Sequence, residues 1–217
     1  MNFDQARANM VEQQVRTWEV LDSRVLDVLG KLPREDFVPP QYRKLAYADL
    51  MLPLGEQQFM MKPVVEGRVL QALGLSAEDS VLEIGTGSGY LTACLGKLAG
   101  RVHSIDVIAD FVRRAESKLK RLDLGDVEVQ EGDALAGWSP GRAYDAVVVT
   151  GSARTVPEHF RPWVKPGGRL FMVCGDSPVM EAMLCTRLGD ETWSEESLFE
   201  TDLPRLIGAE DPEELQF

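Results

Sequence analysis

The feature that most constrains this chain is a short apolar segment that runs directly into three closely spaced glycines. Residues 81–84 have the composition of a buried strand, and Gly85, Gly87 and Gly89 follow at alternate positions. Glycine allows backbone conformations and close approaches that a Cβ atom would obstruct, so this stretch predicts a tight turn from a strand into a helix. In α/β proteins, such a turn lies at the carboxyl edge of a parallel sheet and holds a nucleotide-like ligand.

The spacing of these glycines separates two classes of ligand. A dinucleotide site has the pattern G-x-G-x-x-G, and its helix N-terminus faces a pyrophosphate. Here Gly89 comes one position earlier, and carboxylates stand at Glu83 and at Asp106, which follows the next expected strand. S-adenosylmethionine carries no phosphate and offers ribose hydroxyls, an adenine amine and an ammonium group as donors to carboxylates. The pattern therefore favours S-adenosylmethionine over a dinucleotide.

The rest of the chain alternates between strand-like and helix-like segments. This alternation predicts an α/β fold with a Rossmann-like, mostly parallel sheet and helices on both faces. Strands are expected at 81–84, 102–105, 127–130, 144–150 and 170–174, and helices at 63–73, 90–98, 109–122 and 156–163.

The length of 217 residues fits one domain. Residues 1–62 are expected to form an N-terminal helical layer and a lid-like segment, with two helices that break near 19–22 and a loop over 42–53. Residues 63–188 are expected to form the cofactor-binding core. An acidic C-terminal segment, 189–217, completes the domain.

Charge and composition exclude several classes of function. Residues 190–217 contain ten acidic residues and one basic residue, Arg205, so most of the formal net charge of −12 lies in that segment. We expect the segment to be solvated. No basic face is available for nucleic acid. Three cysteines without a C-x-x-C pattern and only two histidines indicate neither disulfides nor a metal site. The chain has no membrane-length apolar run, so we expect a cytoplasmic protein.

The carboxyl ends of the expected parallel strands meet at one crevice, which lets the cofactor contacts be assigned. We expect Asp106 to bind the ribose and Asp133 the adenine amine, while Val107 covers one face of the adenine. The backbone of residues 85–87 would approach the methionyl end, with Glu83 orienting the loop or meeting the ligand through water. The full set of expected cofactor-binding residues is Met61, Glu83, Gly85, Thr86, Gly87, Gly89, Asp106, Val107, Asp133 and Ala134.

Taken together, seven stretches resemble the protein-L-isoaspartate O-methyltransferase family. The resemblance implies a seven-stranded methyltransferase sheet, S-adenosylmethionine as cofactor, and a protein or peptide acceptor. Members of that family methylate the carboxylate of isoaspartyl residues, which starts the repair of aged proteins. The matching stretches are 22–26 (DSRVL), 33–39 (PREDFVP), 46–49 (AYAD), 52–55 (LPLG), 81–90 (VLEIGTGSGY), 131–133 (EGD) and 165–169 (KPGGR).

The chain departs from the family between Gly55 and Pro63, where the family has the form G-Q-T-I-S-x-P. Phe59 stands at the threonine position and Met61 at the serine position, so both hydroxyls are replaced. In the family this segment lies against the methyl group and the acceptor. An acceptor carboxylate is already ionised at neutral pH and needs no general base, so the loss predicts slow transfer rather than none.

Two alternatives remain open at this point. In the first, the apolar rim made by Phe59 and Met61 accommodates a small-molecule acceptor, such as a carboxylate with a larger apolar part. In the second, the protein binds the cofactor without isoaspartyl transfer. No catalytic residue is assigned. Thr150 and Ser152, at the end of the fourth expected strand, are candidates for a replacement hydroxyl.

Overall fold

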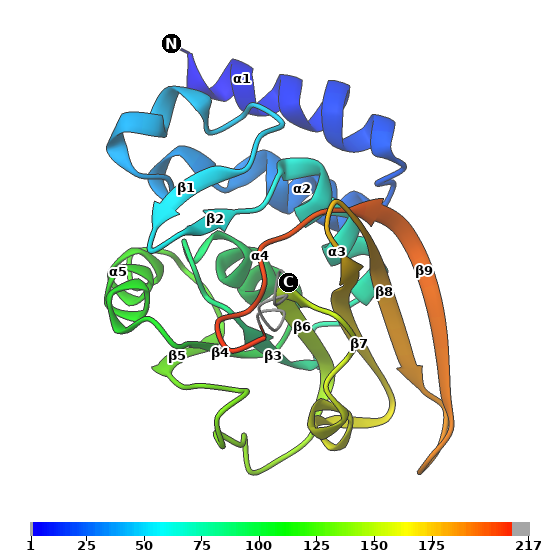
Figure 1. Ribbon diagram of the computed structural model, residues 1–217. Helices are drawn as coiled ribbons and strands as arrows, with labels where there is room; N and C mark the ends of the chain where they lie inside the picture. The colour runs from blue at the N-terminus through cyan, green and yellow to red at the C-terminus, as the bar shows by residue number, and fades with distance from the viewer. Residues whose placement is uncertain (1, 210–217) are drawn as a thin grey trace, which may run out of the picture.

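A seven-stranded sheet forms the centre of the computed structural model, which describes residues 2–209 (Figure 1). The strand order is β5-β4-β3-β6-β7-β8-β9, and the first five strands of that order are parallel. β8 and β9 add to β7 as an antiparallel meander. The bounds are β3 Ser80–Ile84, β4 Arg101–Asp106, β5 Asp126–Glu131, β6 Tyr144–Ala153, β7 Val164–Asp176, β8 Val179–Arg187 and β9 Trp193–Thr201.

The topology confirms the mostly parallel sheet. Chain order reverses between β3 and β6, because β4 and β5 extend the sheet to one side of β3 and β6 and β7 extend it to the other. Ligands of open α/β sheets bind at such a reversal, beyond the carboxyl ends of the strands. The glycine turn that follows β3 lies at this point.

Helices cover the two faces of the sheet unequally. On one face, the apolar side chains of α3 Pro63–Leu73, α4 Tyr90–Leu98 and α5 Ala109–Leu119 share a buried cluster with Val81 and Val148. Their sequence neighbours Leu82 and Val147 point to the other face, as strand alternation requires. That second face is covered by the 3-10 helix Glu158–Trp163, so the expected helix there is a short one.

The N-terminal layer lies over α3 and α4 and contains the two expected helices (Figure 1). α1 Phe3–Met10 continues through a π-helical turn, Val11–Val15, and a 3-10 turn, Arg16–Trp18, before α2 Ser23–Lys31 begins. The expected loop over 42–53 is wrong at its end, where β1 Leu52–Gly55 pairs with β2 Gln58–Met60 as an antiparallel hairpin. No periodicity marks such short strands.

The acidic C-terminal segment is part of the sheet. Residues 193–201 form β9 and Leu203 beyond it is buried, so the backbone of this segment joins the fold, while the acidic side chains of Glu195, Glu196 and Glu200 are exposed as expected. Residues 210–217, which carry the last acidic residues, lie outside the described part of the chain. Leu203 to Ile207, which we call the C-terminal strap, then runs beside β6, where Leu206 N donates to Ser152 O at 2.9 Å. Among residues 2–209, no helix is long and apolar enough to cross a membrane.

Candidate active site

An open cleft lies at the carboxyl ends of β3, β4, β5 and β6. It offers about 690 Å³ of space, its open mouth included. Its lining combines apolar walls with a few polar groups, as small-molecule sites commonly do. The cleft is the natural position for the ligand that the glycine turn predicts.

The three glycines adopt backbone conformations that other residues rarely take. Their φ angles are 97° at Gly85, 52° at Gly87 and 83° at Gly89. A Cβ atom at Gly85 would also collide with Oγ1 of Thr150. Backbone hydrogen bonds fix the turn, because Gly85 N donates to Ile105 O at 2.8 Å. The sequence therefore places bare backbone at the floor of the cleft.

Asp106 is held rigidly at the end of β4. Its Oδ2 accepts from Gly87 N at 2.8 Å and its Oδ1 from Ile108 N at 2.9 Å. Burial raises the pKa of this carboxyl, while the two backbone hydrogen bonds act in the opposite direction. Each oxygen keeps a further lone pair, so Asp106 can still accept hydrogen bonds from a ligand.

Asp133 occupies the corresponding position after β5. Its Oδ1 accepts from Leu135 N at 2.9 Å and Ala136 N at 3.0 Å. Within the described part of the chain, Oδ2 has no hydrogen-bond partner. This oxygen is therefore available to a donor in the cleft.

A second, smaller space of about 310 Å³, its open mouth included, adjoins the cleft, and we call it the inner cavity. Leu54, Phe59, Gly85, Gly87 and Thr150 line both spaces. The inner cavity is also lined by Met60, Met61, Glu66, Glu83, Thr86, Ser88 and Leu91.

Glu83 lies beneath the glycine turn and is fully buried. Its Oε2 accepts hydrogen bonds from the hydroxyls of Ser104 (2.6 Å) and Thr92 (2.5 Å). Burial raises the pKa of Glu83 to about 8, and these two hydrogen bonds oppose the shift. Its Oε1 has no partner among residues 2–209, which is costly for a buried polar atom and points to a ligand or water in the inner cavity.

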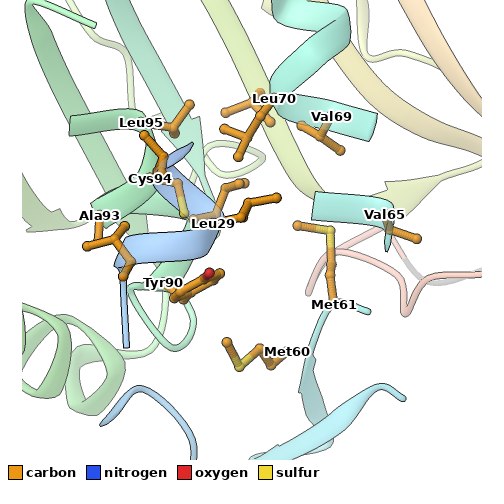
Figure 2. Packing of buried hydrophobic residues seen from close by; sticks show 14 of the residues in the cluster. Leu29, Met60, Met61, Val65, Val69, Leu70, Tyr90, Ala93, Cys94 and Leu95 are labelled. Atoms are coloured by element: carbon orange, nitrogen blue, oxygen red, sulfur yellow. The ribbon is translucent and has the colours of Figure 1, made fainter. Parts of the chain in front are cut away.

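Arg34 fixes the segment that carries Met61. The arginine is fully buried, pairs with Glu66 on α3, and donates to Met61 O at 2.6 Å and Ala46 O at 2.8 Å. Burial raises the pKa of Glu66 to about 7 against the effect of the guanidinium. Figure 2 shows Met60 and Met61 in the same buried cluster as Tyr90. These contacts hold both methionines against the inner cavity.

The linings of the two spaces fit S-adenosylmethionine. The ionisable side chains among the described linings are all carboxyls, and Asp106 and Asp133 are the ones that face the cleft. A ligand with phosphates would be repelled there, whereas a cationic one with several hydrogen-bond donors would be stabilised. Oδ2 of Asp133, which has no partner among residues 2–209, is a suitable acceptor for one of those donors.

The structure brings most of the expected site residues together. Gly85, Gly87, Asp106, Val107, Asp133 and Ala134 line the cleft, while Met61, Glu83 and Thr86 line the inner cavity. Gly89 lines neither, because it begins α4 and packs against Ala115 of α5.

The two candidate hydroxyls differ in position. Thr150 lines both spaces, but its Oγ1 donates to Gly85 O at 2.6 Å. Ser152 lines neither space, is fully buried and donates to Leu203 O at 2.8 Å. Both hydroxyls therefore hold backbone segments in place.

Sequence reasoning missed the cleft wall that the C-terminal strap provides. Pro204, Leu206 and Ile207 line the cleft, although they lie about 100 residues beyond Asp106 in the sequence. The signal available was weak, namely a few apolar residues within an acidic segment. Gln58 and Ile108 were also missed as lining residues.

Curated relatives match nearly the full chain. A protein-L-isoaspartate O-methyltransferase from Rhodopseudomonas palustris is 41% identical over 202 residues and covers 93% of each chain. One from Trichlorobacter lovleyi is 36% identical over 208 residues and covers 96% of each chain.

Solved structures show the same fold. A Plasmodium falciparum structure, named for a β-aspartate methyltransferase and solved with S-adenosyl-L-homocysteine, superposes with a TM-score of 0.78 at 17% identity and covers 95% of this chain and 98% of its own. Another protein-L-isoaspartate O-methyltransferase also gives a TM-score of 0.78, at 23% identity, over 92% of this chain and 65% of its own. The family model described as protein-L-isoaspartate(D-aspartate) O-methyltransferase matches residues 5–202, and this chain therefore belongs to that family.

Proposed function

We propose that this protein is an S-adenosylmethionine-dependent methyltransferase that methylates the carboxylate of isoaspartyl residues in proteins or peptides and so starts their repair. The observation that carries the cofactor assignment is the acid-lined cleft at the chain reversal of the sheet, with no basic side chain among its described lining residues. Family membership over residues 5–202 supports an isoaspartyl carboxylate as the methyl acceptor.

The proposal gives each group in the cleft a role in holding the cofactor. Asp106 binds the ribose hydroxyls and Asp133 Oδ2 binds the adenine amine, with Val107 and Ala134 beside the base. Gly85, Thr86 and Gly87 hold the methionyl end through backbone contacts, and Gly89 supports the turn from α4. Glu83 supports the turn from below, and Met61 faces the methyl group from the inner cavity.

The chemistry demands little from individual side chains. When bound, S-adenosylmethionine supplies an electrophilic methyl group on a positively charged sulfur. An acceptor carboxylate needs no deprotonation at neutral pH, so the residues of this chain have to align it and exclude water. Leu54, Phe59, Met61 and Leu91 give the inner cavity the apolar wall that such exclusion requires.

The cellular location follows from the same proposal. Repair of aged proteins and three free thiols, at Cys94, Cys174 and Cys185, are consistent with the reducing cytoplasm. A basic surface is not needed, because the acceptor is a protein or peptide and not a nucleic acid.

Methyl transfer to an isoaspartyl peptide, measured beside the same peptide with ordinary aspartate, tests this function. We expect transfer to the isoaspartyl peptide only. Absence of transfer to either peptide, in a protein that binds the cofactor by calorimetry, would contradict the acceptor assignment.

A small-molecule acceptor is the second candidate, favoured by the replacement of both family hydroxyls at Phe59 and Met61. Transfer to small carboxylates or phenols, without transfer to peptides, would support it. Cofactor binding with no product from any acceptor would instead indicate a binding protein without turnover.

A further inference from the structure

Lys118 of α5 is a partly buried lysine whose ammonium group joins the glycine turn to the N-terminal layer. Its Nζ donates to Phe37 O at 2.9 Å and to Ser88 O at 3.2 Å. The ammonium also lies over the Phe37 ring, 5.5 Å from the ring centroid. Hydrogen bonds from a charged donor are roughly twice as strong as those between neutral groups. This side chain therefore links three segments that are far apart in the sequence.

Two adjacent residues of the glycine turn are held by different elements. Gly87 N donates to Asp106 Oδ2 at 2.8 Å, which ties this residue to the end of β4. Ser88 O, in the next residue, accepts instead from Lys118 on α5. The conformation of the turn therefore depends on a polar contact with α5 as well as on its contacts with the sheet.

α5 packs directly against the turn at this point. A Cβ atom at Gly89 would lie 3.0 Å from Cβ of Ala115, which precedes Lys118 by three residues. Residues three apart share one face of a helix, so Ala115 and Lys118 both face the turn. Ser88 lines the inner cavity, and Gly87 beside it lines both the cleft and the inner cavity. A displacement of Ser88 would therefore change the backbone surface that both spaces present to a ligand.

The surroundings of Lys118 make its charge sensitive to pH. Burial lowers the pKa of Lys118 to about 8, Arg114 on the same helix acts in the same direction, and Asp36 of the N-terminal layer opposes the shift. The glycine turn, residues 85–89, contributes no ionisable side chain. Tyr90, which follows the turn, stays uncharged because burial raises the pKa of its phenol. The ammonium thus loses a proton within a pH range where ligand binding can be measured.

We propose that Lys118 is a positioning residue of the cofactor site, which keeps the glycine turn in its binding conformation by tying Ser88 O to the N-terminal layer. Lys118 is not among the described lining residues of the cleft or the inner cavity, so it acts through the turn and not on the ligand. This inference rests on the proposed function and adds a residue that controls the affinity for S-adenosylmethionine.

Binding of S-adenosyl-L-homocysteine, measured by calorimetry at pH 7, tests this role without any acceptor. Lys118→Met removes both hydrogen bonds with a side chain of similar length, and we expect Kd to rise roughly tenfold. Lys118→Arg keeps the charge and the donors, so it should retain most of the affinity. Lys120→Met is the matched control and should bind like the wild type, because Lys120 is exposed and forms an ion pair with Glu116.

The pH dependence separates positioning by the ammonium from a general loss of structure. For the wild type, Kd should rise roughly threefold between pH 7 and pH 9.5, since a neutral amine donates more weakly than an ammonium. Arginine stays charged over this range, so the rise should be smaller for Lys118→Arg. Glu83 also titrates near pH 8, but it is present in both proteins and contributes equally to both profiles.

The steady-state constants give a second readout. With an isoaspartyl peptide as the acceptor, Lys118→Met should raise KM for the cofactor and leave kcat at saturating cofactor largely unchanged, because the lost contact acts on binding. A lower kcat with an unchanged KM would overturn the positioning role.

The outcomes also separate this inference from the proposed function. Equal affinity of the wild type and Lys118→Met overturns the positioning role and leaves the proposed function standing. A pH profile of Lys118→Arg identical to that of the wild type also overturns it, and this comparison does not depend on the folding of Lys118→Met. Failure of the wild type to bind S-adenosyl-L-homocysteine refutes the cofactor assignment and the proposed function with it.

Discussion

Replacing Glu83 by glutamine should make the stability of this protein much less sensitive to pH. Glu83 is fully buried, and burial raises its pKa from 4.5 to about 8 against the hydrogen bonds from Ser104 and Thr92. The folded protein therefore keeps a proton on Glu83 at pH values where the unfolded chain has lost it. The glutamine is uncharged and similar in size, and its carbonyl oxygen can accept from the same two hydroxyls.

The difference between the pKa of Glu83 in the folded and the unfolded state sets how much the free energy of unfolding changes with pH. Below pH 4.5 the Glu83 carboxyl is protonated in both states, and its contribution to stability is fully present. As pH rises from 4.5 to about 8, the unfolded chain loses the proton that the folded protein keeps on Glu83, so the free energy of unfolding falls. The total loss is on the order of 4 kcal/mol, since each tenfold change in proton affinity is about 1.4 kcal/mol. Glu83→Gln should not show this loss.

Urea unfolding of the cofactor-free proteins between pH 5 and pH 9, followed by circular dichroism, measures the effect. With a slope of about 2 kcal/mol per molar urea, the variant's midpoint should gain roughly 2 M on that of the wild type between these pH values. Glu66 titrates in both proteins, so its contribution largely cancels. Glu196→Gln, at an exposed position of β9, is the control and should follow the wild type. Parallel curves for the wild type and Glu83→Gln would refute the reasoning.

Three further predictions concern the cleft and its hairpin. Asp106→Ala should weaken cofactor binding by about 1–3 kcal/mol through lost ribose hydrogen bonds, and unchanged affinity in calorimetry would show that the site is misplaced. The double variant Phe59→Thr, Met61→Ser should increase transfer to an isoaspartyl peptide, because it restores the family hydroxyls; activity no higher than wild type would mean that they are not the limiting element. Gln57→Gly should raise the free energy of unfolding by roughly 0.5–1 kcal/mol, since Gln57 has φ 57° in the hairpin turn; lower stability in a thermal melt would reveal a contact made by its side chain.

The local architecture of the cofactor site could be predicted because each part is encoded in adjacent residues. The apolar strand, the three glycines and α4 follow one another directly, and α3 has its expected bounds, with Pro63 at its first turn and Gly74 after its end in the left-handed conformation. Asp106 and Asp133 follow predicted strands, and parallel strands bring their carboxyl ends to one edge. Both residues accordingly line one cleft.

The β1–β2 hairpin could not be predicted in the same way. Its strands have only four and three residues, and its turn residues Glu56 and Gln57 both have positive φ without being glycine or asparagine. The strand pairing and the hydrogen bond from Arg34 to Met61 O hold this segment in place. The outward direction of Phe59 follows from that pairing.

The sequence by itself determined the parallel sheet, the glycine turn after β3 and the acidic residues at the strand ends, because these depend on short-range pattern and on the fixed geometry of parallel strands. Only the tertiary structure decided that the acidic C-terminal segment joins the sheet as β9, that the strap forms a wall of the cleft, and that Glu83 is buried beneath the turn with one oxygen unpartnered within the described part of the chain. Those outcomes depend on contacts between residues far apart in the chain, which set burial and local charge and which no local pattern records.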